Sequence, residues 1–453
     1  MSLTISRILH AGYLFECGGT RIAFDPIFEN PFSRNCHAFP EVRFDLEQVR
    51  KLDLAAVFIS HFHDDHCSLE SLDLLDRATP IYLYCQFDEL FAMIRELGFE
   101  QVHPLRTDEA VAVGPFTVTP REALDAEVDS MYQIEAAGVK VLNVVDSWIA
   151  PPALAGLARA APWDMVLWPF QTMREIEVIA PMRADHSAPE VPQEWIDQLR
   201  VLAPRYVVPS SCQFVQEPWS WYNHAMFPIS YRQFTAAVES ALPATRVVRL
   251  DPSVSFVLSA DALTAAAPLS WVLPVGDQDV DYGYRPDAAP PPTADIARRF
   301  EPLTDAQTAL VMDYCRTGLP DKYRTMELPE DSYFKKPRHW RLAVYDHTGA
   351  VAHFDYRVEG DAIEPVEDGA ITWLTEVSVA KIYAALALGE SLTSMYVRIN
   401  DTAFDATTEE EIADADVVDD PLIRCLFNDA FGAYQAAQLR RLKSAAQLPR
   451  DVQ

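Results

Sequence analysis

The chain has 453 residues, of which 49% are hydrophobic and 23% are charged, and its 37 basic and 67 acidic residues give a formal net charge of −30. This composition is that of a folded globular protein and excludes a disordered, collagen-like or coiled-coil chain. The acidic balance disfavours nucleic acid and anionic membrane surfaces as partners, because their phosphate groups would be repelled.

The first 60 residues predict short strands at 5–9, 13–16 and 21–24, with a tight turn at Gly18-Gly19. Residues 54–60 (LAAVFIS) form a continuous apolar run, which is typical of a strand covered on both faces. Nothing near the N-terminus has the basic region and apolar run of an export signal, and no run approaches the roughly 18 apolar residues of a membrane span.

Strands and helices then alternate up to about residue 265. The pattern predicts strands at 81–85, 116–119, 131–134, 139–145, 165–169, 206–209 and 247–250, and helices at 69–75, 87–97 and 192–202. This order indicates two sheets faced by helices. The seven cysteines are scattered and form no CxxC pair, so we expect reduced thiols and a cytoplasmic protein.

A proline-rich stretch at 284–295 (YRPDAAPPPTAD) predicts a semi-rigid linker between a catalytic domain at 1–283 and an accessory domain at 296–453. The second domain is expected to be a smaller α+β unit. Its predicted strands are 340–345, 351–358 and 394–399, and its predicted helices are 377–388 and 422–442. The acidic run 405–420 is interpreted as a solvated face, or as a docking patch for a basic electron-transfer partner.

Three histidines fall within six positions in the run His61-Phe62-His63-Asp64-Asp65-His66, directly after the apolar segment 54–60. Imidazole and carboxylate groups are ligands of zinc, iron and manganese. A rigid strand that ends in such a run brings these groups into one small volume. The run predicts a metal site, and the alternative is a solvated polar loop.

The run HFHDDH resembles the HxHxDH signature of the metallo-β-lactamase superfamily, and ILHAGYLFECGGTRIAFDPIF resembles the opening hairpins of that fold. The resemblance covers about residues 1–265 and implies an α/β fold of the αβ/βα sandwich type with two metal ions at the rim of its sheets. The ligands that it implies are His61 and His63 for one ion and Asp65 and His66 for the other, with Asp25 as an aspartate that supports them.

Further ligands are expected downstream. Asp146 follows the apolar segment 139–145 and resembles the family's bridging aspartate, although it could also be a turn or N-cap residue. The family's last ligand is usually a histidine after a later strand, which His224 fits better than His186. His186 would instead contact substrate, and both could be polar loop residues. The neighbouring Trp221 and Tyr222 are expected to wall a substrate pocket or, equally, to belong to the core.

One stretch departs from the zinc hydrolases of the superfamily, which carry a histidine before the position of Asp146. Residues 116–138 contain no histidine, and the nearest candidate is Glu122, with Asp125 and Asp129 behind it. A carboxylate in place of an imidazole suits iron or manganese better than zinc. A Glu here resembles the chloramphenicol β-hydroxylase type of diiron oxygenase, and the alternative is that Glu122 is an ordinary surface residue.

The resemblance thus implies a dinuclear metalloenzyme, with iron preferred over zinc or manganese, that uses O₂ to oxidise a small polar metabolite. Asp146 and Glu122 are its expected catalytic residues. No flavin or nicotinamide motif occurs, so an external electron donor would be needed. The alternative is a zinc or manganese hydrolase of a lactone, ester or phosphoester. The expected partner is a small-molecule substrate, and neither nucleic acid nor a membrane is expected as a partner. A homodimer is an open alternative to a monomer.

Overall fold

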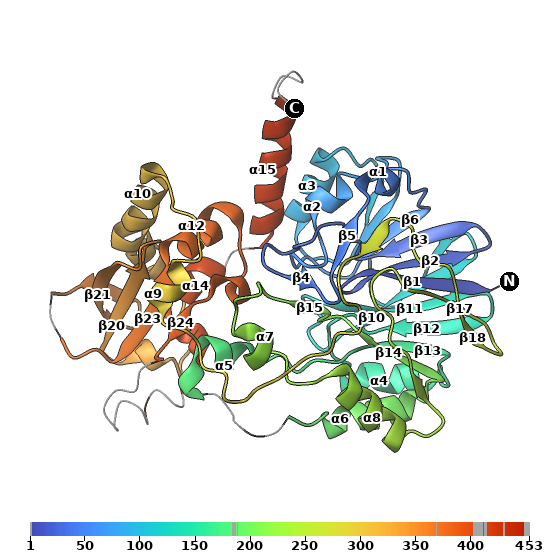
Figure 1. Ribbon diagram of the computed structural model, residues 1–453. Helices are drawn as coiled ribbons and strands as arrows, with labels where there is room; N and C mark the ends of the chain where they lie inside the picture. The colour runs from blue at the N-terminus through green and yellow to red at the C-terminus, as the bar shows by residue number, and fades with distance from the viewer. Residues whose placement is uncertain are drawn as a thin grey trace.

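The computed structural model describes residues 2–183, 187, 189–367, 369–401, 411, 415–428 and 431–447. Two large sheets pack face to face in the N-terminal part, and a third sheet lies in a separate body formed by the C-terminal part (Figure 1). The αβ/βα sandwich and the extra α+β region expected from the sequence are both present.

The first sheet has eight strands in the order β18-β17-β1-β2-β3-β6-β7-β8. Their bounds are β1 Leu3–Leu9, β2 Gly12–Cys17, β3 Thr20–Phe24, β6 Ala56–Ile59, β7 Ile81–Leu83, β8 Val102–Pro104, β17 Ser255–Leu258 and β18 Leu263–Ala265. The β1–β2 and β2–β3 pairs are antiparallel, and β3 pairs with β6 in parallel. Strands β1, β3 and β6 therefore point the same way, and their carboxyl ends meet at one edge of the sheet.

The second sheet has seven strands in the order β16-β14-β13-β12-β11-β10-β9. Their bounds are β9 Val111–Val113, β10 Phe116–Glu122, β11 Ser130–Ala136, β12 Val139–Asn143, β13 Met165–Pro169, β14 Tyr206–Ser210 and β16 Arg246–Val247. The strand predicted at 247–250 is thus shorter than expected and begins one residue earlier.

A hydrophobic core fills the space between the two sheets. Phe24 and Phe58 of the first sheet meet Tyr132 of the second at ring-centroid distances of 5.1 and 6.1 Å. The alternate residues of the same strands, such as Val57 and Leu142, belong to a second core on the helix side of each sheet. Helices cover these outer faces, namely α2 Leu69–Leu72, α3 Asp88–Glu96, α4 Pro151–Ala158, α6 Gln193–Leu202 and α8 Tyr231–Ala241 (Figure 1).

Short elements connect these layers at the rim. Two small antiparallel pairs join β4 His37–Ala38 to β15 Phe214–Val215 and β5 Val42–Phe44 to β19 Val272–Pro274. The remaining short helices of the N-terminal part are α1 Leu46–Val49, α5 Glu175–Ile179 and α7 Tyr222–Ala225.

The C-terminal sheet has five strands in the order β22-β21-β20-β23-β24. These are β20 Arg338–Tyr345, β21 Val351–Glu359, β22 Ala362–Pro365, β23 Trp373–Ser378 and β24 Arg398–Ile399. The α-helices among the described residues are α9 Thr293–Ala297, α10 Asp305–Asp313, α11 Leu319–Tyr323, α12 Val379–Leu388, α14 Pro421–Phe427 and α15 Ala433–Gln447. Trp340, Trp373 and Phe334 lie in a hydrophobic core that these elements share.

Three predictions for this region are corrected by the structure. Residues 373–378 form β23, paired in parallel with β20, and the helix begins only at Val379. The strand predicted at 394–399 is reduced to Arg398–Ile399, because a 3₁₀ turn occupies Leu392–Met395. The single helix predicted at 422–442 is two helices, since Gly432 adopts a φ of 66°, which a helix interior does not allow.

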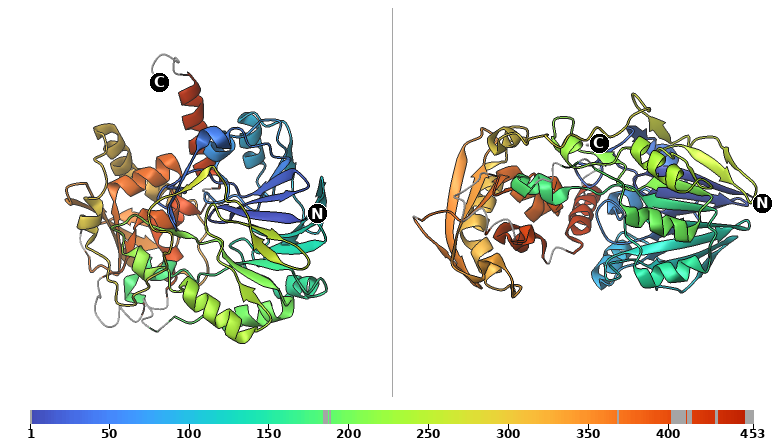
Figure 2. Two further views of the ribbon diagram at one scale, coloured as in Figure 1. Left: turned by 45° about the vertical axis from the view of Figure 1, so that its right-hand side comes forward. Right: turned by 90° about the horizontal axis from the view of Figure 1, so that it is seen from below.

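The C-terminal helix α15 packs against α2 and α3 of the N-terminal part (Figure 2). The Gln435 side-chain amide donates to the backbone carbonyls of Phe62 and Cys67 at 2.8 and 2.7 Å, and Gln438 accepts from the Leu69 N–H at 2.7 Å. The two parts of the chain are therefore joined by buried polar contacts next to the histidine-rich run. The domain division at 284–295 stays a prediction.

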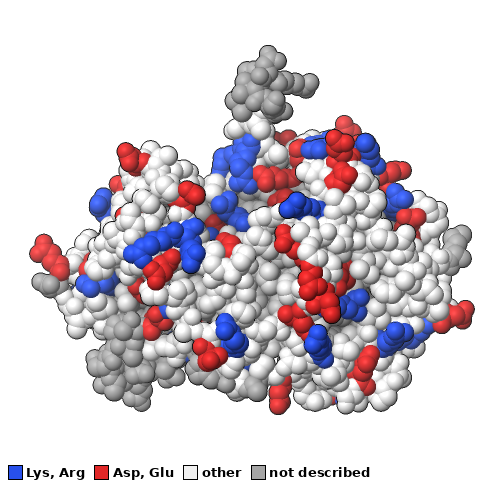
Figure 3. Space-filling view, viewed as in Figure 1, with Lys and Arg blue, Asp and Glu red and all other residues white. Residues whose placement is uncertain are grey.

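The surface carries interspersed acidic and basic side chains (Figure 3). Within the described residues, no helix combines the length and apolar character needed to cross a membrane. All seven cysteines are free thiols. Much of the acidic run 405–420 lies outside the described residues, but Asp420 is fully buried, so the run is not solvated throughout. The Asp420 carboxylate accepts from Trp373 Nε1 at 2.7 Å and caps α14.

Candidate metal centre

The histidine-rich run lies in a turn directly after β6, at the edge where β1, β3 and β6 end. His61 and His66 are each about 1% exposed, whereas His63 is exposed. Ser130, the first residue of β11, donates its hydroxyl to the Ser60 carbonyl at 2.9 Å and ties the second sheet to this turn. The turn therefore lies where the rims of both sheets meet.

A first group of potential ligands consists of His61, His63 and Asp129. His61 Nε2 lies 3.0 Å from His63 Nδ1 and 3.8 Å from Asp129 Oδ1. Asp129 precedes β11, so the second sheet supplies this carboxylate and the first sheet supplies the two imidazoles.

A second group consists of His10, Asp65, His66 and Asp146. His10 Nε2 lies 3.0 Å from Asp65 Oδ2 and 3.3 Å from His66 Nε2. His66 Nε2 lies 3.0 Å from Asp146 Oδ2. The ring nitrogens and carboxylate oxygens therefore converge on one volume, as ligands of one cation do.

Asp146 connects the two groups. Its Oδ2 belongs to the second group, and its Oδ1 lies 3.9 Å from His61 Nε2 of the first. A carboxylate with one oxygen in each group can bind two ions at once and hold them about 3.5–4 Å apart. The arrangement supports a dinuclear site, with Asp146 in the bridging position predicted from the sequence.

Asp25 orients the imidazole of His66. The backbone N–H and the hydroxyl of Ser60 both donate to Asp25 at 2.7 Å, and His66 Nδ1 donates to Asp25 Oδ2 at 3.0 Å. His61 Nδ1 lies 2.9 Å from the Ser60 hydroxyl. When Nδ1 carries the proton, Nε2 keeps its lone pair for a metal, and partners of this kind raise the affinity of ligating histidines.

The backbone is strained at the rim. His10, Asp25 and Val145 have φ values of 49°, 39° and 64°, although none is a glycine. Such conformations cost about 1–3 kcal/mol each and cluster at functional sites. Gly12 is needed beside them, because a Cβ there would lie 2.8 Å from the Asp25 carbonyl oxygen. The fold therefore holds these residues in place against their local preference.

The side chains fit a cation. Asp129 Oδ1 and Asp146 Oδ1 are buried without a hydrogen-bond partner among the described residues, and no lysine or arginine belongs to either group. Burial lowers the pKa of His61 well below its usual value, which keeps its imidazole neutral and able to bind a metal. Burial, together with the charge of Asp146, raises the pKa of Asp129 to about 6. Crowded carboxylates without a lysine or arginine partner are an arrangement that a bound metal ion stabilises.

The structure does not bring Glu122 into either group. Glu122 is the last residue of β10, is exposed, and lies beside Arg121 and Asp108 at a small cavity of about 170 Å³. The chain turns back through residues 123–129, so Asp129 reaches His61 and His63 instead. A carboxylate does lie beside the two histidines, as expected from the sequence, but it belongs to Asp129 and not to Glu122.

His224 also lies outside both groups. Its Nδ1 donates to the Gly283 carbonyl at 2.9 Å, and its ring lines a separate cavity of about 480 Å³ with His37 and Tyr282. His10 is the histidine that completes the second group, so the prediction of His224 as a ligand is not supported. His186 lies outside the described residues.

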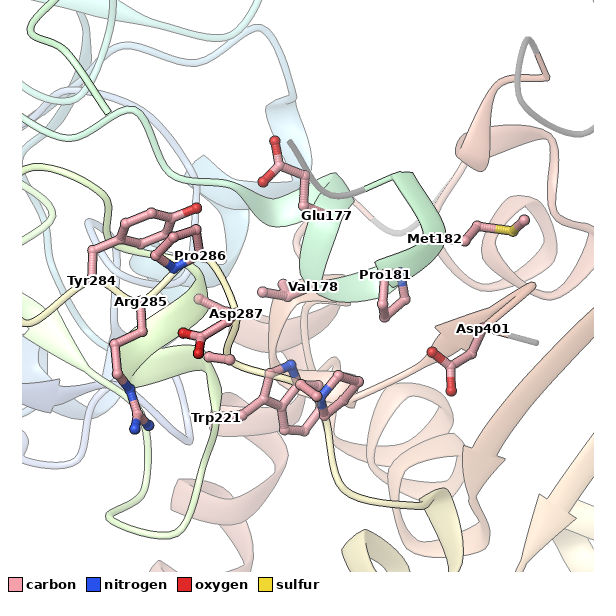
Figure 4. Close-up of a pocket in the computed structure, with 14 residues that line it drawn as sticks. Glu177, Val178, Pro181, Met182, Trp221, Tyr284, Arg285, Pro286, Asp287 and Asp401 are labelled. Atoms are coloured by element: carbon pink, nitrogen blue, oxygen red, sulfur yellow. The ribbon is translucent and has the colours of Figure 1, made fainter. Parts of the chain in front are cut away.

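The two aromatic residues predicted to bind substrate are both buried. Trp221 lines a cavity of about 270 Å³ with Val178, Tyr284 and Asp287, none of which is a candidate ligand (Figure 4). Tyr222 is fully buried, and its ring lies 4.9 Å from that of Tyr396. These two residues form an aromatic contact with Tyr396 of the C-terminal part, and their role in binding substrate stays a prediction.

Sequence reasoning missed His10. The signal available was its position directly after the first predicted strand, as Asp25 follows the third strand and His61 follows the strand at 54–60. Polar residues after strands that run in one direction meet at one edge of a sheet. This signal can be used only when the strand directions are known, and these depend on which connections are hairpins and which are crossovers.

Comparison with known proteins finds a family model that matches much of the N-terminal part. Residues 20–210, less than half of the chain, match the family model described as a beta-lactamase superfamily domain. Among curated proteins, the cytidine monophosphate-N-acetylneuraminic acid hydroxylase of Cricetulus griseus is 29% identical over 151 residues, which is 31% of this chain and 26% of the relative. The inactive form from Homo sapiens is 28% identical over 31% of this chain and 30% of its own length. The match thus spans under a third of these relatives.

Solved structures similar to part of this chain include a metallo hydrolase of Ignicoccus hospitalis, with 16% identity and a TM-score of 0.41 over 57% of this chain and 99% of that one. The diiron beta-hydroxylase CmlA of Streptomyces venezuelae has 16% identity and a TM-score of 0.39 over 57% of this chain and 54% of its own.

Proposed function

We propose that this protein is a diiron enzyme that oxidises a small metabolite with O₂, because residues 20–210 match a beta-lactamase superfamily domain and two ligand groups lie at the rim of the fold. The observation that carries the proposal is the carboxylate of Asp129 beside His61 and His63. The zinc hydrolases that the sequence resembles carry a histidine in this region. The name of the curated relatives, a hydroxylase, supports an oxidative reaction.

The donor set favours iron. Its members are the imidazoles of His10, His61, His63 and His66 and the carboxylates of Asp65, Asp129 and Asp146. A set with three carboxylates is harder and more anionic than one built mainly from imidazoles, and it suits iron or manganese better than zinc. Identifying the bound metal therefore tests the proposed function most directly.

Bound iron would supply the reductive activation of O₂. The overall reaction consumes one O₂, two electrons and two protons. One oxygen atom converts a C–H or N–H group of the substrate to C–OH or N–OH, and the other oxygen atom leaves as water. The chain carries no flavin or nicotinamide motif, so a separate reductase supplies the electrons. Asp146 would bind both ions through its two oxygens. Asp25 fixes the orientation of the His66 ring, and Ser60 fixes that of the His61 ring.

Glu175 of α5 can hold a proton beside the centre. Burial raises the pKa of its carboxyl, and the charges of Asp65 and Asp146 act in the same direction. The Thr393 hydroxyl, from the C-terminal part, lies 3.4 Å from Glu175 Oε1 and fixes the side chain. In the metal-free protein the Glu175 carboxyl therefore keeps its proton to a higher pH than an exposed glutamate does.

Metal analysis of the full chain tests the proposal. Protein produced with ample iron and zinc should contain two irons per chain, and O₂ uptake with a chemical reductant should depend on them. Asp129→His should shift the bound metal from iron towards zinc, since it restores an imidazole. Glu122→Gln is the matched control and should leave the metal content unchanged, because Glu122 is exposed and outside both groups.

Two zinc ions in the native protein, together with hydrolysis of a lactone, ester or phosphoester, would overturn the oxidative proposal in favour of metal-assisted hydrolysis. Equal iron content in the wild-type and Asp129→His proteins would show that Asp129 does not select the metal.

A further inference from the structure

Arg7 of β1 is a buried cation behind the second ligand group. Its side chain is 0% exposed, and it precedes His10 by three residues. Nη1 donates to the backbone carbonyl of His10 at 2.7 Å and to Gln213 Oε1 at 2.5 Å. Nη2 donates to the Pro209 carbonyl at 3.1 Å and to the Tyr13 hydroxyl. Because Tyr13 lies in β2 and Pro209 in β14, one guanidinium joins the turn that carries His10 to both large sheets.

All four of these acceptors are uncharged groups. A link to a carboxylate runs only through Gln213, whose Nε2 donates to Asp251 Oδ1 at 3.1 Å. Burying a charge is costly unless its hydrogen bonds are satisfied, so packing alone does not explain a cation at this position. A guanidinium carries a rigid fork of donors, which suits it to holding several oxygen atoms in fixed positions.

The backbone of His10 needs such support. His10 is the first residue of the two-residue loop between β1 and β2, in which Leu9 pairs with Gly12, and its φ is 49°. A positive φ at the first position of such a loop favours glycine. The pairing of β1 with β2 also shifts between Arg7 and Leu9, so the ladder is irregular just before the loop. The bond from Arg7 to the His10 carbonyl spans this irregular segment.

The ring of His10 lacks the support that the other buried imidazoles of the two groups have. Their Nδ1 atoms have hydrogen-bond partners, whereas His10 Nδ1 is buried without one among the described residues. The ring of His10 instead packs against that of Phe214 at 5.7 Å. Phe214 directly follows Gln213, which Arg7 holds. Arg7 therefore acts on His10 through its backbone and through the segment that contacts its ring.

We propose that Arg7 is a positioning residue that holds His10 in the left-handed conformation from which Nε2 of its imidazole meets Asp65 and His66. Without the guanidinium, the loop would relax towards the conformations that a histidine prefers, and the second group would lose one of its four potential ligands. The first group would keep its ligands. The inference rests on the ligand groups of the proposed function, and it does not depend on whether the bound metal is iron.

Zinc titration of chelator-treated, full-length protein, in competition with a chromophoric chelator, tests this role without turnover. His63→Ala identifies the binding step of the first group. We expect Arg7→Met to weaken the other step about 10–100-fold, as the loss of a partner that orients a ligating histidine does. Arg7→Lys keeps the charge but not the fork of donors, so it should weaken the same step by less, and it serves where Arg7→Met does not fold.

Arg398→Met is the matched control, because it removes a guanidinium that is 2% exposed in the C-terminal sheet. It should change neither zinc-binding step. Equal weakening of both steps by the Arg7 variants would show a general loosening of the fold and would overturn the inference.

A double-mutant cycle tests whether Arg7 acts through His10. In His10→Ala, zinc still binds weakly to the remaining ligands of the second group, and adding Arg7→Lys should change that residual affinity by less than about twofold. The same further weakening as in the wild-type background would overturn the inference, and so would a His10→Ala protein with unchanged zinc affinity. Zinc instead of iron in the native protein would overturn the proposed function and leave the role of Arg7 intact.

Discussion

Replacing Asp129 by asparagine should stabilise the metal-free protein while it removes metal binding from the first ligand group. In the metal-free state the Asp129 carboxylate is largely buried and close to the charge of Asp146, and no lysine or arginine belongs to either ligand group. Asparagine has nearly the same shape and carries no charge. Stability and metal content should therefore change in opposite directions, which an ordinary structural residue would not produce.

The magnitude follows from the pKa of Asp129. Burial and the charge of Asp146 raise it to about 6 from its ordinary value of 3.8. A rise of this size corresponds to at most about 3 kcal/mol of destabilisation once the carboxyl is ionised. The side chain is 19% exposed, so solvent reduces the effect, and we expect a gain of about 1–3 kcal/mol for Asp129→Asn at pH 7.5.

The pH dependence has a definite sign. Below pH 4 the carboxyl is protonated in both the folded and the unfolded chain and costs nothing. Between pH 4 and pH 6 it ionises in the unfolded chain first, so the folded state loses stability as the pH rises, and above pH 6 the cost is constant. The advantage of Asp129→Asn should therefore grow from pH 4 to pH 6 and stay level at higher pH.

Urea unfolding of chelator-treated full-length protein, followed by tryptophan fluorescence, measures this difference, and elemental analysis of reloaded protein measures the metal. Glu122→Gln is the control and should change neither quantity. A metal-free Asp129→Asn protein that is no more stable than wild type at pH 7.5, or that still binds two metal ions, would refute the placement of Asp129 in the centre.

Three further predictions concern other parts of the site. His10→Ala should reduce the metal content from two ions to one per chain by elemental analysis, whereas His224→Ala should keep both, and the reverse result would restore the ligand predicted from the sequence. Asp25→Asn should weaken metal binding about 10–100-fold in a competition titration with a chelator, because it removes the partner that orients a ligating imidazole; unchanged affinity would contradict this role. Lys381→Met should destabilise the protein in urea unfolding because buried Glu390 loses its closest cation. The cost should be less than the roughly 3–5 kcal/mol of an uncompensated buried charge, since Arg34 still pairs with Glu390, and Lys381→Met combined with Glu390→Gln should recover most of the loss. Additive effects of the last two changes would show that the pair is not coupled.

The hairpins and the metal motif could be predicted from the sequence because their causes are local. Strands β1 to β3 alternate with tight turns, and β6 is a short apolar run that ends in the histidine-rich turn. Likewise, Asp146 directly follows a strongly apolar strand. Each of these features depends on residues within about ten positions of one another, so neighbouring residues suffice to predict them.

The identity of the remaining ligands was decided by tertiary structure. Three acidic residues, Glu122, Asp125 and Asp129, offered a carboxylate before β11, and the path of one turn brought only Asp129 to His61. His10 joins the centre because β1 runs in the same direction as β6. This direction depends on the two hairpins β1–β2 and β2–β3 and on the parallel pairing of β3 with β6, in which Ile22 lies beside Ala56. The position of His10 directly after a predicted strand becomes informative only once the directions of the strands are known.

The sequence by itself therefore determined the type of fold, the histidine-rich turn and the presence of an extra carboxylate near it. Only the tertiary structure decided which carboxylate and which histidine complete the two groups, and that Arg7 lies against the backbone of that histidine. The physical reason is that backbone hydrogen bonding and side-chain periodicity act over a few residues, whereas ligands converge through strand order and packing across the whole sandwich.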